Sequence, residues 1–113
     1  MNSICSERRV SIVNPQGLHA RPADMFVRLA NRFSSDVQVV KGNERVDGKS
    51  ILSILTLAAV QGTELTIAAR GSDAQAATDA LADLIVTGFD EQMETAFEQP
   101  VENQQATPDP QNR

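Results

Sequence analysis

Apolar and polar residues alternate in short stretches of the chain, which is the pattern of a β-strand with one buried face. Val10 and Ile12 lie between polar neighbours and predict a strand over residues 8–13. Three further strands are predicted at residues 37–40, 44–46 and 64–69. The Lys-Gly-Asn sequence of residues 41–43 has turn chemistry, so the second and third strands should form a hairpin.

Apolar residues at helical spacing predict three helices among these strands. The first covers residues 20–33, the second residues 51–60 with Gly62 at its end, and the third follows the Gly-Ser-Asp of residues 71–73. The first should pack through Pro22, Phe26, Leu29, Ala30 and Phe33, and the third through Ala77, Leu81, Leu84 and Ile85. The resulting order, β-α-β-β-α-β-α, favours an α+β sandwich with one sheet face against helices and the other toward water.

Length and composition limit the chain to one small domain. It has 113 residues, with four Phe and no Trp or Tyr, so we expect a core of Val, Ile, Leu and Ala. Cys5 is the only cysteine, and we interpret it as an incidental thiol in a loose N-terminus, residues 1–7. We find neither an apolar run typical of a secretory signal nor a stretch of membrane-spanning length, which predicts a cytoplasmic protein without a membrane partner.

The net charge of -5 is concentrated at the C-terminal end. Residues 1–90 carry nine basic and ten acidic side chains, whereas residues 91–113 carry one basic and five acidic side chains. We expect this acidic tail to be frayed helix followed by disorder, because its few apolar residues cannot offset the entropy of ordering it. These residues are Met93, Ala96, Phe97 and Val101. The chain has no basic stripe with aromatics, which argues against a nucleic-acid partner and ranks an RNA-binding role low.

The only histidine, His19, falls at the predicted start of the first helix, after the turn residues 14–17. Pro22 suits an early helical position because its φ is fixed and its missing N–H would have had no intrahelical partner. First-turn N–H groups favour an anion, and Arg21 adds a guanidinium. Together these groups could accept a phosphoryl group and hold its charge. On spacing alone, a surface histidine before ordinary helix punctuation is the more common interpretation.

A resemblance to a known family favours the interpretation of His19 as a functional residue. The run GLHARPA, residues 17–23, resembles the active-site signature of HPr, the histidine-containing phosphocarrier of the bacterial phosphoenolpyruvate-dependent sugar phosphotransferase system. The run DGKSILSILTLAAVQGTELTIAARG, residues 47–71, is similar to the second signature of the family, and the interval between the two also matches. The resemblance covers residues 8–90 as an HPr-like domain and leaves the two ends unexplained.

The resemblance implies an antiparallel four-stranded sheet in the order 1-4-2-3 with three helices on one face. It further implies that His19 accepts a phosphoryl group, as pros-phosphohistidine, from enzyme I and passes it to EIIA-type acceptor proteins. The site would comprise His19, the Ala20 backbone N–H, Arg21, Pro22 and Gly17. Such a protein is a carrier and not an enzyme, needs no cofactor or metal, and is expected to be a monomer because it must expose its site to successive partners.

Ser50 has two roles that do not exclude each other. Its position predicts an N-cap of the second helix, and the resemblance implies regulatory phosphorylation by the HPr kinase/phosphorylase that some bacteria have. The following helix is apolar over more than one stripe, so Ile54, Leu57 and Ala58 are predicted to fill the core. A partner-docking surface would then comprise Lys49, Ile51, Leu52 and Leu55. Alternatively, the aromatic-poor core absorbs all of these apolar residues.

Asp24 departs from the family, which more often has a small or hydroxyl residue there. We place it in the first helical turn, where its carboxylate could repel a phosphoryl group on His19. Two alternatives therefore stay open. One is a regulatory relative, either of the nitrogen-type phosphotransfer branch or acting chiefly as a kinase substrate. The other is a protein-binding module that has lost transfer, although the presence of His19, Arg21 and Pro22 together argues against it.

Overall fold

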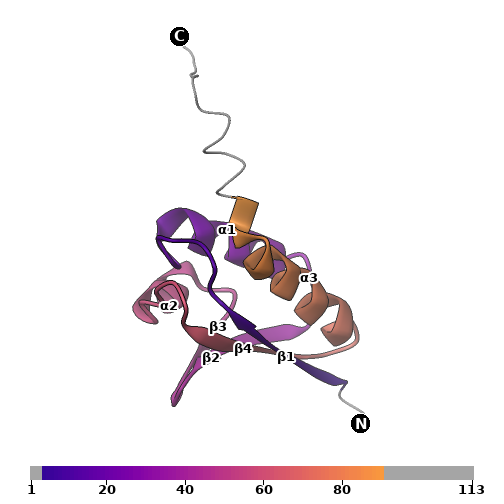
Figure 1. Ribbon diagram of the computed structural model, residues 1–113. Coiled ribbons are helices and arrows are strands. Elements are labelled where there is room, and N and C mark those ends of the chain that lie inside the picture. The colour runs from indigo at the N-terminus through magenta and orange to yellow at the C-terminus, as the bar shows by residue number, and fades with distance from the viewer. Residues whose placement is uncertain (1–3, 91–113) are drawn as a thin grey trace.

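The structure, a computed structural model, describes residues 4–90 and consists of one antiparallel sheet with three helices on one face (Figure 1). Both the predicted fold class and the strand order β1-β4-β2-β3 are confirmed. Within residues 4–90, no helix is long and apolar enough to cross a membrane. The elements are β1 (Cys5–Ser11), α1 (Ala20–Ala30), β2 (Asp36–Lys41), β3 (Glu44–Asp47), α2 (Ile51–Thr56), β4 (Glu64–Arg70), α3 (Ala74–Val86) and the 3₁₀ turn η1 (Gly88–Asp90).

The sheet is built from the predicted alternation. In the antiparallel register, Val10 of β1 lies opposite Leu65 of β4, and Val39 of β2 lies opposite Ile67 of β4. These four side chains are buried, because each points to the face that the helices cover. The intervening residues point to the open face of the sheet.

The N-terminal strand begins earlier than predicted, at Cys5, and ends at Ser11 rather than at residue 13. The prediction that residues 1–7 form a loose N-terminus is therefore wrong for residues 5–7, which pair with β4. The sequence concealed this because the inward residues here are polar. The Ser6 hydroxyl lies 2.7 Å from the Thr78 hydroxyl of α3, so hydrogen bonding replaces apolar burial. Residues 1–3 and the predicted acidic tail, residues 91–113, lie outside the described residues.

Phenylalanines contribute more to the core than predicted. Val, Ile, Leu and Ala supply most of it, but Phe26 and Phe89 are the largest fully buried side chains. Gly88 and Phe89 both adopt left-handed conformations, with φ of 71° and 59°, which end α3 and place Phe89 in the core. The expected core faces are otherwise confirmed, except that Leu29, Phe33 and Leu84 are only half-buried against the core.

Helix α2 is shorter than predicted. It ends at Thr56 rather than Val60, because Ala58 adopts the left-handed conformation, with φ of 48°. The prediction that Ala58 fills the core is wrong, since Ala58 is exposed and Ala59 is buried instead. Gly62 does not end the helix, and its N–H donates to the Ile12 carbonyl at 2.8 Å. The segment after α2 therefore packs beside the loop that follows β1.

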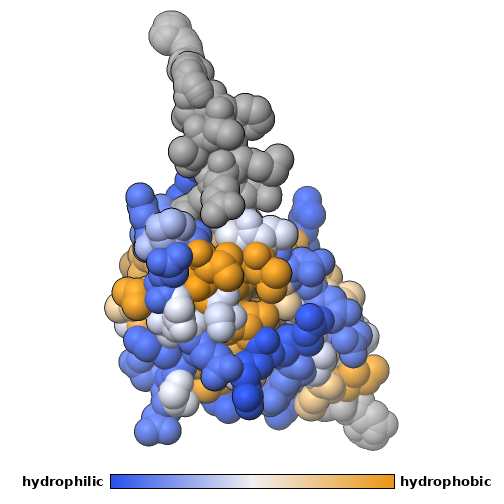
Figure 2. All heavy atoms as spheres, in the orientation of Figure 1, coloured by the Kyte–Doolittle hydropathy of each residue, from blue (hydrophilic) through white to orange (hydrophobic). Residues whose placement is uncertain are grey.

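The surface is mostly polar but carries apolar areas. Figure 2 shows hydrophobic residues gathered on one face, close to the end of the described chain, with hydrophilic residues over much of the rest. The most exposed large hydrophobic residues are Leu52, Val60 and Val86, at 72%, 65% and 58%. Leu52 is the one that belongs to the docking surface predicted from the sequence.

Candidate functional site

His19 is the N-cap of α1. Its backbone is extended, with φ of -83° and ψ of -170°, and its carbonyl accepts the Ala23 N–H at 3.0 Å, the first bond of the helix. The His19 N–H donates to the Gly17 carbonyl at 3.0 Å, which fixes the backbone on the other side. The imidazole is half-buried and caps none of the first-turn amides of the described helix. The ring therefore lies at the start of α1 without accepting a hydrogen bond from the first-turn amides.

The predicted site residues Ala20, Arg21 and Pro22 form the first turn behind His19. The N–H groups of Ala20 and Arg21 precede the Ala23–His19 bond, and in an α-helix such groups point past the N-terminal end. Pro22 has no N–H, and its buried ring packs this turn onto the core. Together with the helix dipole, these amides create a positive potential at the helix start.

Gly17 is required by the shape of the turn before His19. It has φ of +70°, and a Cβ at this position would lie 2.4 Å from the Ala59 carbonyl oxygen. The Gly17 N–H donates to the Asn14 carbonyl at 3.1 Å, and the buried Asn14 side chain donates its Nδ2–H to the Gly17 carbonyl at 2.9 Å. Any side chain larger than hydrogen would displace the turn from the segment behind it.

That supporting segment, residues 59–63, was missed by the sequence analysis. The Ala59 carbonyl accepts the Leu18 N–H at 2.9 Å, and the Thr63 carbonyl accepts the Ile12 N–H at 2.9 Å. The Gln61 side chain donates to the Val13 carbonyl at 3.0 Å. The available signal was the Gly-Thr of residues 62–63, which we interpreted only as the end of a helix. The segment fixes the loop from which His19 projects.

Asp24 does not lie in the first turn of α1, contrary to the prediction, because the helix begins at Ala20 and its first turn contains no acidic residue. Its carboxylate accepts a hydrogen bond from Arg28 Nε at 2.8 Å, one turn farther along the helix from His19. The guanidinium balances the charge of Asp24 locally, which reduces its repulsion of an anion at the helix start.

Ser50 is the N-cap of α2, as predicted, and its hydroxyl oxygen accepts the Ser53 N–H at 3.3 Å. The preceding Lys49 is partly buried, and its ammonium donates to the Phe33 carbonyl at 2.8 Å. Lys49 thereby links the start of α2 to the chain just after α1.

The predicted docking residues do not form one exposed patch. Leu52 is 72% exposed, which contradicts the alternative that the core absorbs every apolar residue of this helix. Ile51 and Leu55 are half-buried and pack against the core, so the prediction that they face outward is only partly correct. An exposed leucine flanked by two half-exposed apolar residues remains beside Ser50.

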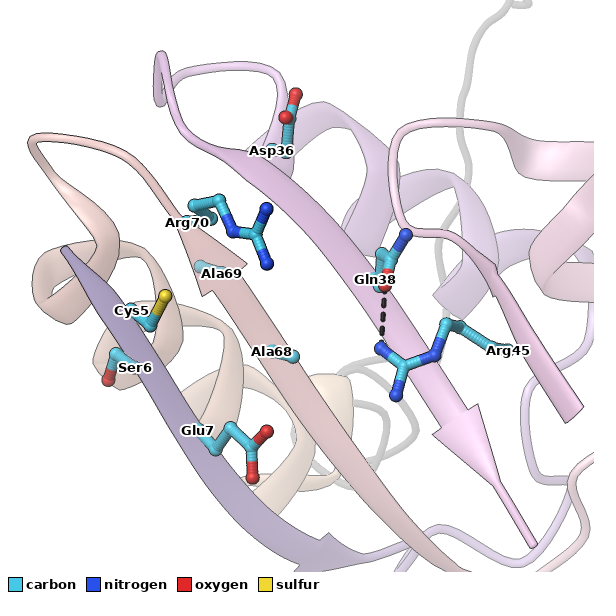
Figure 3. Close-up of a pocket in the computed structure, with 9 residues that line it drawn as sticks. All are labelled: Cys5, Ser6, Glu7, Asp36, Gln38, Arg45, Ala68, Ala69 and Arg70. Carbon is cyan, nitrogen blue, oxygen red and sulfur yellow. Dashed lines mark hydrogen bonds between the residues drawn. The ribbon is translucent and has the colours of Figure 1, made fainter. Parts of the chain in front are cut away.

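A separate hollow of about 310 Å³ lies on the sheet, and none of the predicted site residues lines it. Figure 3 shows Ala68 on the central strand of the hollow, with Arg70 farther along the same strand and Arg45 reaching in from the strand beyond Gln38. Arg45 donates to the Gln38 side-chain oxygen at 2.6 Å. The small Ala68 side chain between longer neighbours leaves this space. The hollow is therefore a feature of the open face and not part of the His19 site.

Comparisons with known proteins show which family this chain belongs to. A family model described as "PTS HPr component phosphorylation site" matches residues 6–87. The HPr-like protein Crh of Bacillus subtilis is 45% identical over 76 residues, which are 67% of this chain and 89% of Crh. The phosphocarrier protein HPr of Neisseria meningitidis serogroup A is 41% identical over 85 residues, 75% of this chain and 96% of that protein.

Among solved structures, HPr-C-His from Thermoanaerobacter tengcongensis superposes with a TM-score of 0.74 at 44% identity. The match covers 76% of this chain and 97% of that chain. Sequence and fold thus agree over nearly the whole length of these relatives.

Proposed function

This chain belongs to the HPr family of phosphocarrier proteins of the phosphotransferase system, and we propose that it carries its phosphoryl group on His19. The donor would be the phosphohistidine of enzyme I, and the acceptors would be EIIA-type proteins. The observation that carries the proposal is the position of His19 as an N-cap whose ring does not cap its own helix. An imidazole so placed can receive an anion where the helix end stabilises it.

In the proposed step, the lone pair of the neutral His19 Nδ1 attacks the phosphorus on the donor histidine. A new P–N bond forms as the donor P–N bond breaks. The donor ring, protonated on its other nitrogen, leaves as a neutral imidazole with the electron pair of that bond, and the His19 ring keeps its proton at Nε2, so charge is conserved. One phosphohistidine replaces another, so the step requires alignment and charge stabilisation more than a chemical driving force. Neither a metal nor a cofactor takes part in this step.

The surrounding groups have distinct parts in the proposal. The Ala20 and Arg21 amides and the Arg21 guanidinium stabilise charge on the transferred group. Gly17 and Pro22 position the turn without touching the phosphoryl group. The hydrogen bonds from residues 59–63 support that positioning, because they fix the loop before His19 from behind.

We also propose that Leu52, with Ile51 and Leu55, contacts protein partners, and that Ser50 is a regulatory phosphorylation site for an HPr kinase/phosphorylase. A phosphate on Ser50 would add negative charge beside Leu52. Its oxygens could accept the Ser53 N–H in place of the hydroxyl, so α2 need not unfold. The modification would weaken docking of an acidic partner while preserving the domain.

The test is mass spectrometry of the full chain after incubation with phosphoenolpyruvate and enzyme I from the same host. We expect one acid-labile phosphoryl group on the wild-type protein and on Ser50→Ala, and none on His19→Ala. If the wild-type protein stays unmodified while the same enzyme I charges another HPr, the proposal fails.

A regulatory carrier is the second candidate, favoured by the 45% identity to the HPr-like protein Crh. It would be phosphorylated at His19 or Ser50 but would signal rather than supply sugar uptake. Incubating the His19-phosphorylated protein with sugar-specific and nitrogen-type acceptors separates the candidates by which acceptor gains the group. The pairing of Asp24 with Arg28 favours either carrier over a module that has lost transfer.

A further inference from the structure

Ala58 adopts the left-handed backbone conformation just before the segment that supports the His19 turn. Its φ of 48° is unfavourable for a residue with a Cβ, which comes too close to the following carbonyl oxygen. Among residues 4–90, Ala58 and Phe89 are the two non-glycine residues with positive φ. A residue in this conformation persists only where its surroundings hold it, and such residues cluster at functional sites. The contacts that hold Ala58 are therefore relevant to the His19 site.

The peptide group that joins Leu57 to Ala58 is hydrogen-bonded on both sides. Its N–H, which belongs to Ala58, donates to the Leu55 carbonyl at 3.1 Å. Its carbonyl, which belongs to Leu57, accepts a hydrogen bond from the Lys41 ammonium at 2.7 Å. Lys41 is the last residue of β2, and its half-buried side chain reaches from the sheet to the end of α2. Because the donor is charged, this bond is stronger than one between neutral groups, and it fixes the orientation of the peptide group.

The conformation of Ala58 determines what the next residue can reach. Because the chain leaves the helix at Ala58, Ala59 is buried and its carbonyl faces the turn that precedes α1. That carbonyl accepts the Leu18 N–H at 2.9 Å, and a Cβ on Gly17 would lie 2.4 Å from the same oxygen. Lys41 is thus connected to Leu18 through one strained residue and two hydrogen bonds.

We propose that Lys41 is a positioning residue for phosphoryl transfer through His19. By holding the Leu57 carbonyl, Lys41 keeps Ala58 in the left-handed conformation. This in turn keeps the Ala59 carbonyl against the turn that precedes α1 and so fixes the backbone from which the imidazole projects. The inference rests on the proposed function, because it adds to the His19 site a residue of β2 that acts through the backbone.

Hydrogen exchange of the Leu18 amide measures this support without phosphoryl transfer. Lys41→Met removes the ammonium but keeps an unbranched side chain, and we expect it to speed Leu18 exchange by about tenfold relative to the amides of the central strand β4. The β4 reference corrects for a general loss of stability. Lys49→Met is the matched control for Leu18 exchange, because Lys49 also donates to a backbone carbonyl, that of Phe33, at 2.8 Å. An equal change at Leu18 and β4, or the same change in the control, overturns the proposal.

A double-mutant cycle with Ala58→Gly tests the step through the strained residue. Glycine adopts positive φ without steric cost, and Ala58 is exposed, so the substitution removes little packing. Lys41→Met should therefore speed Leu18 exchange less in the Ala58→Gly background than in the wild-type background. Equal effects in the two backgrounds contradict the proposed step. If Lys41→Met does not fold, Lys41→Gln, which keeps a neutral donor, replaces it in the same cycle with the same two outcomes.

The effect on transfer is measured with the full chain as the substrate of enzyme I. Because Lys41 acts on the placement of the imidazole and not on the surface around Leu52, Lys41→Met should lower kcat by about tenfold and change KM by less than about twofold. Lys41→Arg, which keeps a charged donor, should recover most of the loss. A change in KM alone excludes the positioning role. If the wild-type protein takes up no phosphoryl group, the proposed function fails, and the exchange experiment still decides whether Lys41 supports the turn before His19.

Discussion

Helices α1 and α2 both begin after an extended residue, His19 and Ser50, but only Ser50 turns its side chain onto the helix that follows. The Ser50 hydroxyl accepts the Ser53 N–H, whereas the His19 ring accepts none of the α1 amides. The Ser50 side chain thus caps its own helix. The His19 side chain does not, so the positive potential at the start of α1 can act on an anion from outside the helix. The difference is consistent with the proposed roles, in which His19 carries the transferred group and Ser50 is a structural cap that a kinase could modify.

The largest expected effect comes from giving α1 the cap that α2 has. His19→Ser should abolish phosphoryl acceptance from enzyme I, since the imidazole is lost. It should also raise the free energy of unfolding by about 1 kcal/mol relative to His19→Ala, because serine is a good N-cap and alanine a poor one. Urea unfolding of both variants measures the gain. Equal stability of the two would show that the extended backbone at residue 19 does not present a side chain to the first turn.

A second substitution tests the turn that precedes His19. Gly17→Ala should lower the free energy of unfolding by more than about 1 kcal/mol, because alanine is strained at positive φ and its Cβ would clash with the Ala59 carbonyl. The rate of phosphoryl transfer should fall as the turn shifts. Gly42→Ala is the matched control, since Gly42 also has positive φ but a Cβ there meets nothing within 4 Å. If both substitutions cost the same, the contact with Ala59 contributes nothing.

At the start of α2 the expected effect is purely on stability. Ser50→Ala should cost about 1 kcal/mol of unfolding free energy by removing the acceptor for the Ser53 N–H, and should leave transfer through His19 intact. Ser53→Ala retains that N–H and should cost less, which makes it the control. Thermal unfolding followed by circular dichroism compares the two, and an equal loss would contradict the capping role.

At the start of α3 there is a third arrangement, in which the Asp73 side chain accepts hydrogen bonds from a neighbouring segment of the chain. Hydrogen bonds from the Ser35 hydroxyl and then the Ser34 N–H lower the Asp73 pKa from 3.8 to about 2. The ionised form is thus favoured by folding, and its contribution is present above pH 3.8 and lost as the pH falls toward 2. Asp73→Asn should lower the Tm at neutral pH by an amount that shrinks across this interval. A constant difference in Tm from pH 7 to pH 2 would contradict it.

Much of the fold could be predicted because its pattern is local. Residues such as Val10, Val39 and Ile67 alternate with polar neighbours, and alternation alone identifies a half-buried strand. The strand order could not be obtained in this way, because pairing between distant strands leaves no local signal, and only the family resemblance supplied it. Cys5 to Glu7 were missed for a related reason, since the inward side chain of Ser6 is satisfied by a hydroxyl of α3.

The candidate site was likewise predictable only where its features are local in the sequence. The helix start at His19 was predictable, since turn residues, a lone histidine and an early proline are all local features. The support from residues 59–63 was not. The run Leu57-Ala58-Ala59-Val60 has good helical composition, but the contact of Ala59 with Leu18 requires the chain to leave the helix at Ala58. Tertiary packing overrides propensity there.

The pairing of β1 with β4 has a consequence for the chain as it is synthesised. Residues 5–18 leave the ribosome first, but the groups that hold them, from the Ala59 carbonyl to Arg70, are among the last parts of the domain to emerge. Since contacts so distant in sequence form only after the intervening chain is available, the His19 turn takes its shape late in translation. An unfinished chain therefore contains His19 but not the turn and helix start that position it, so we expect the proposed phosphorylation of His19 to require the complete domain.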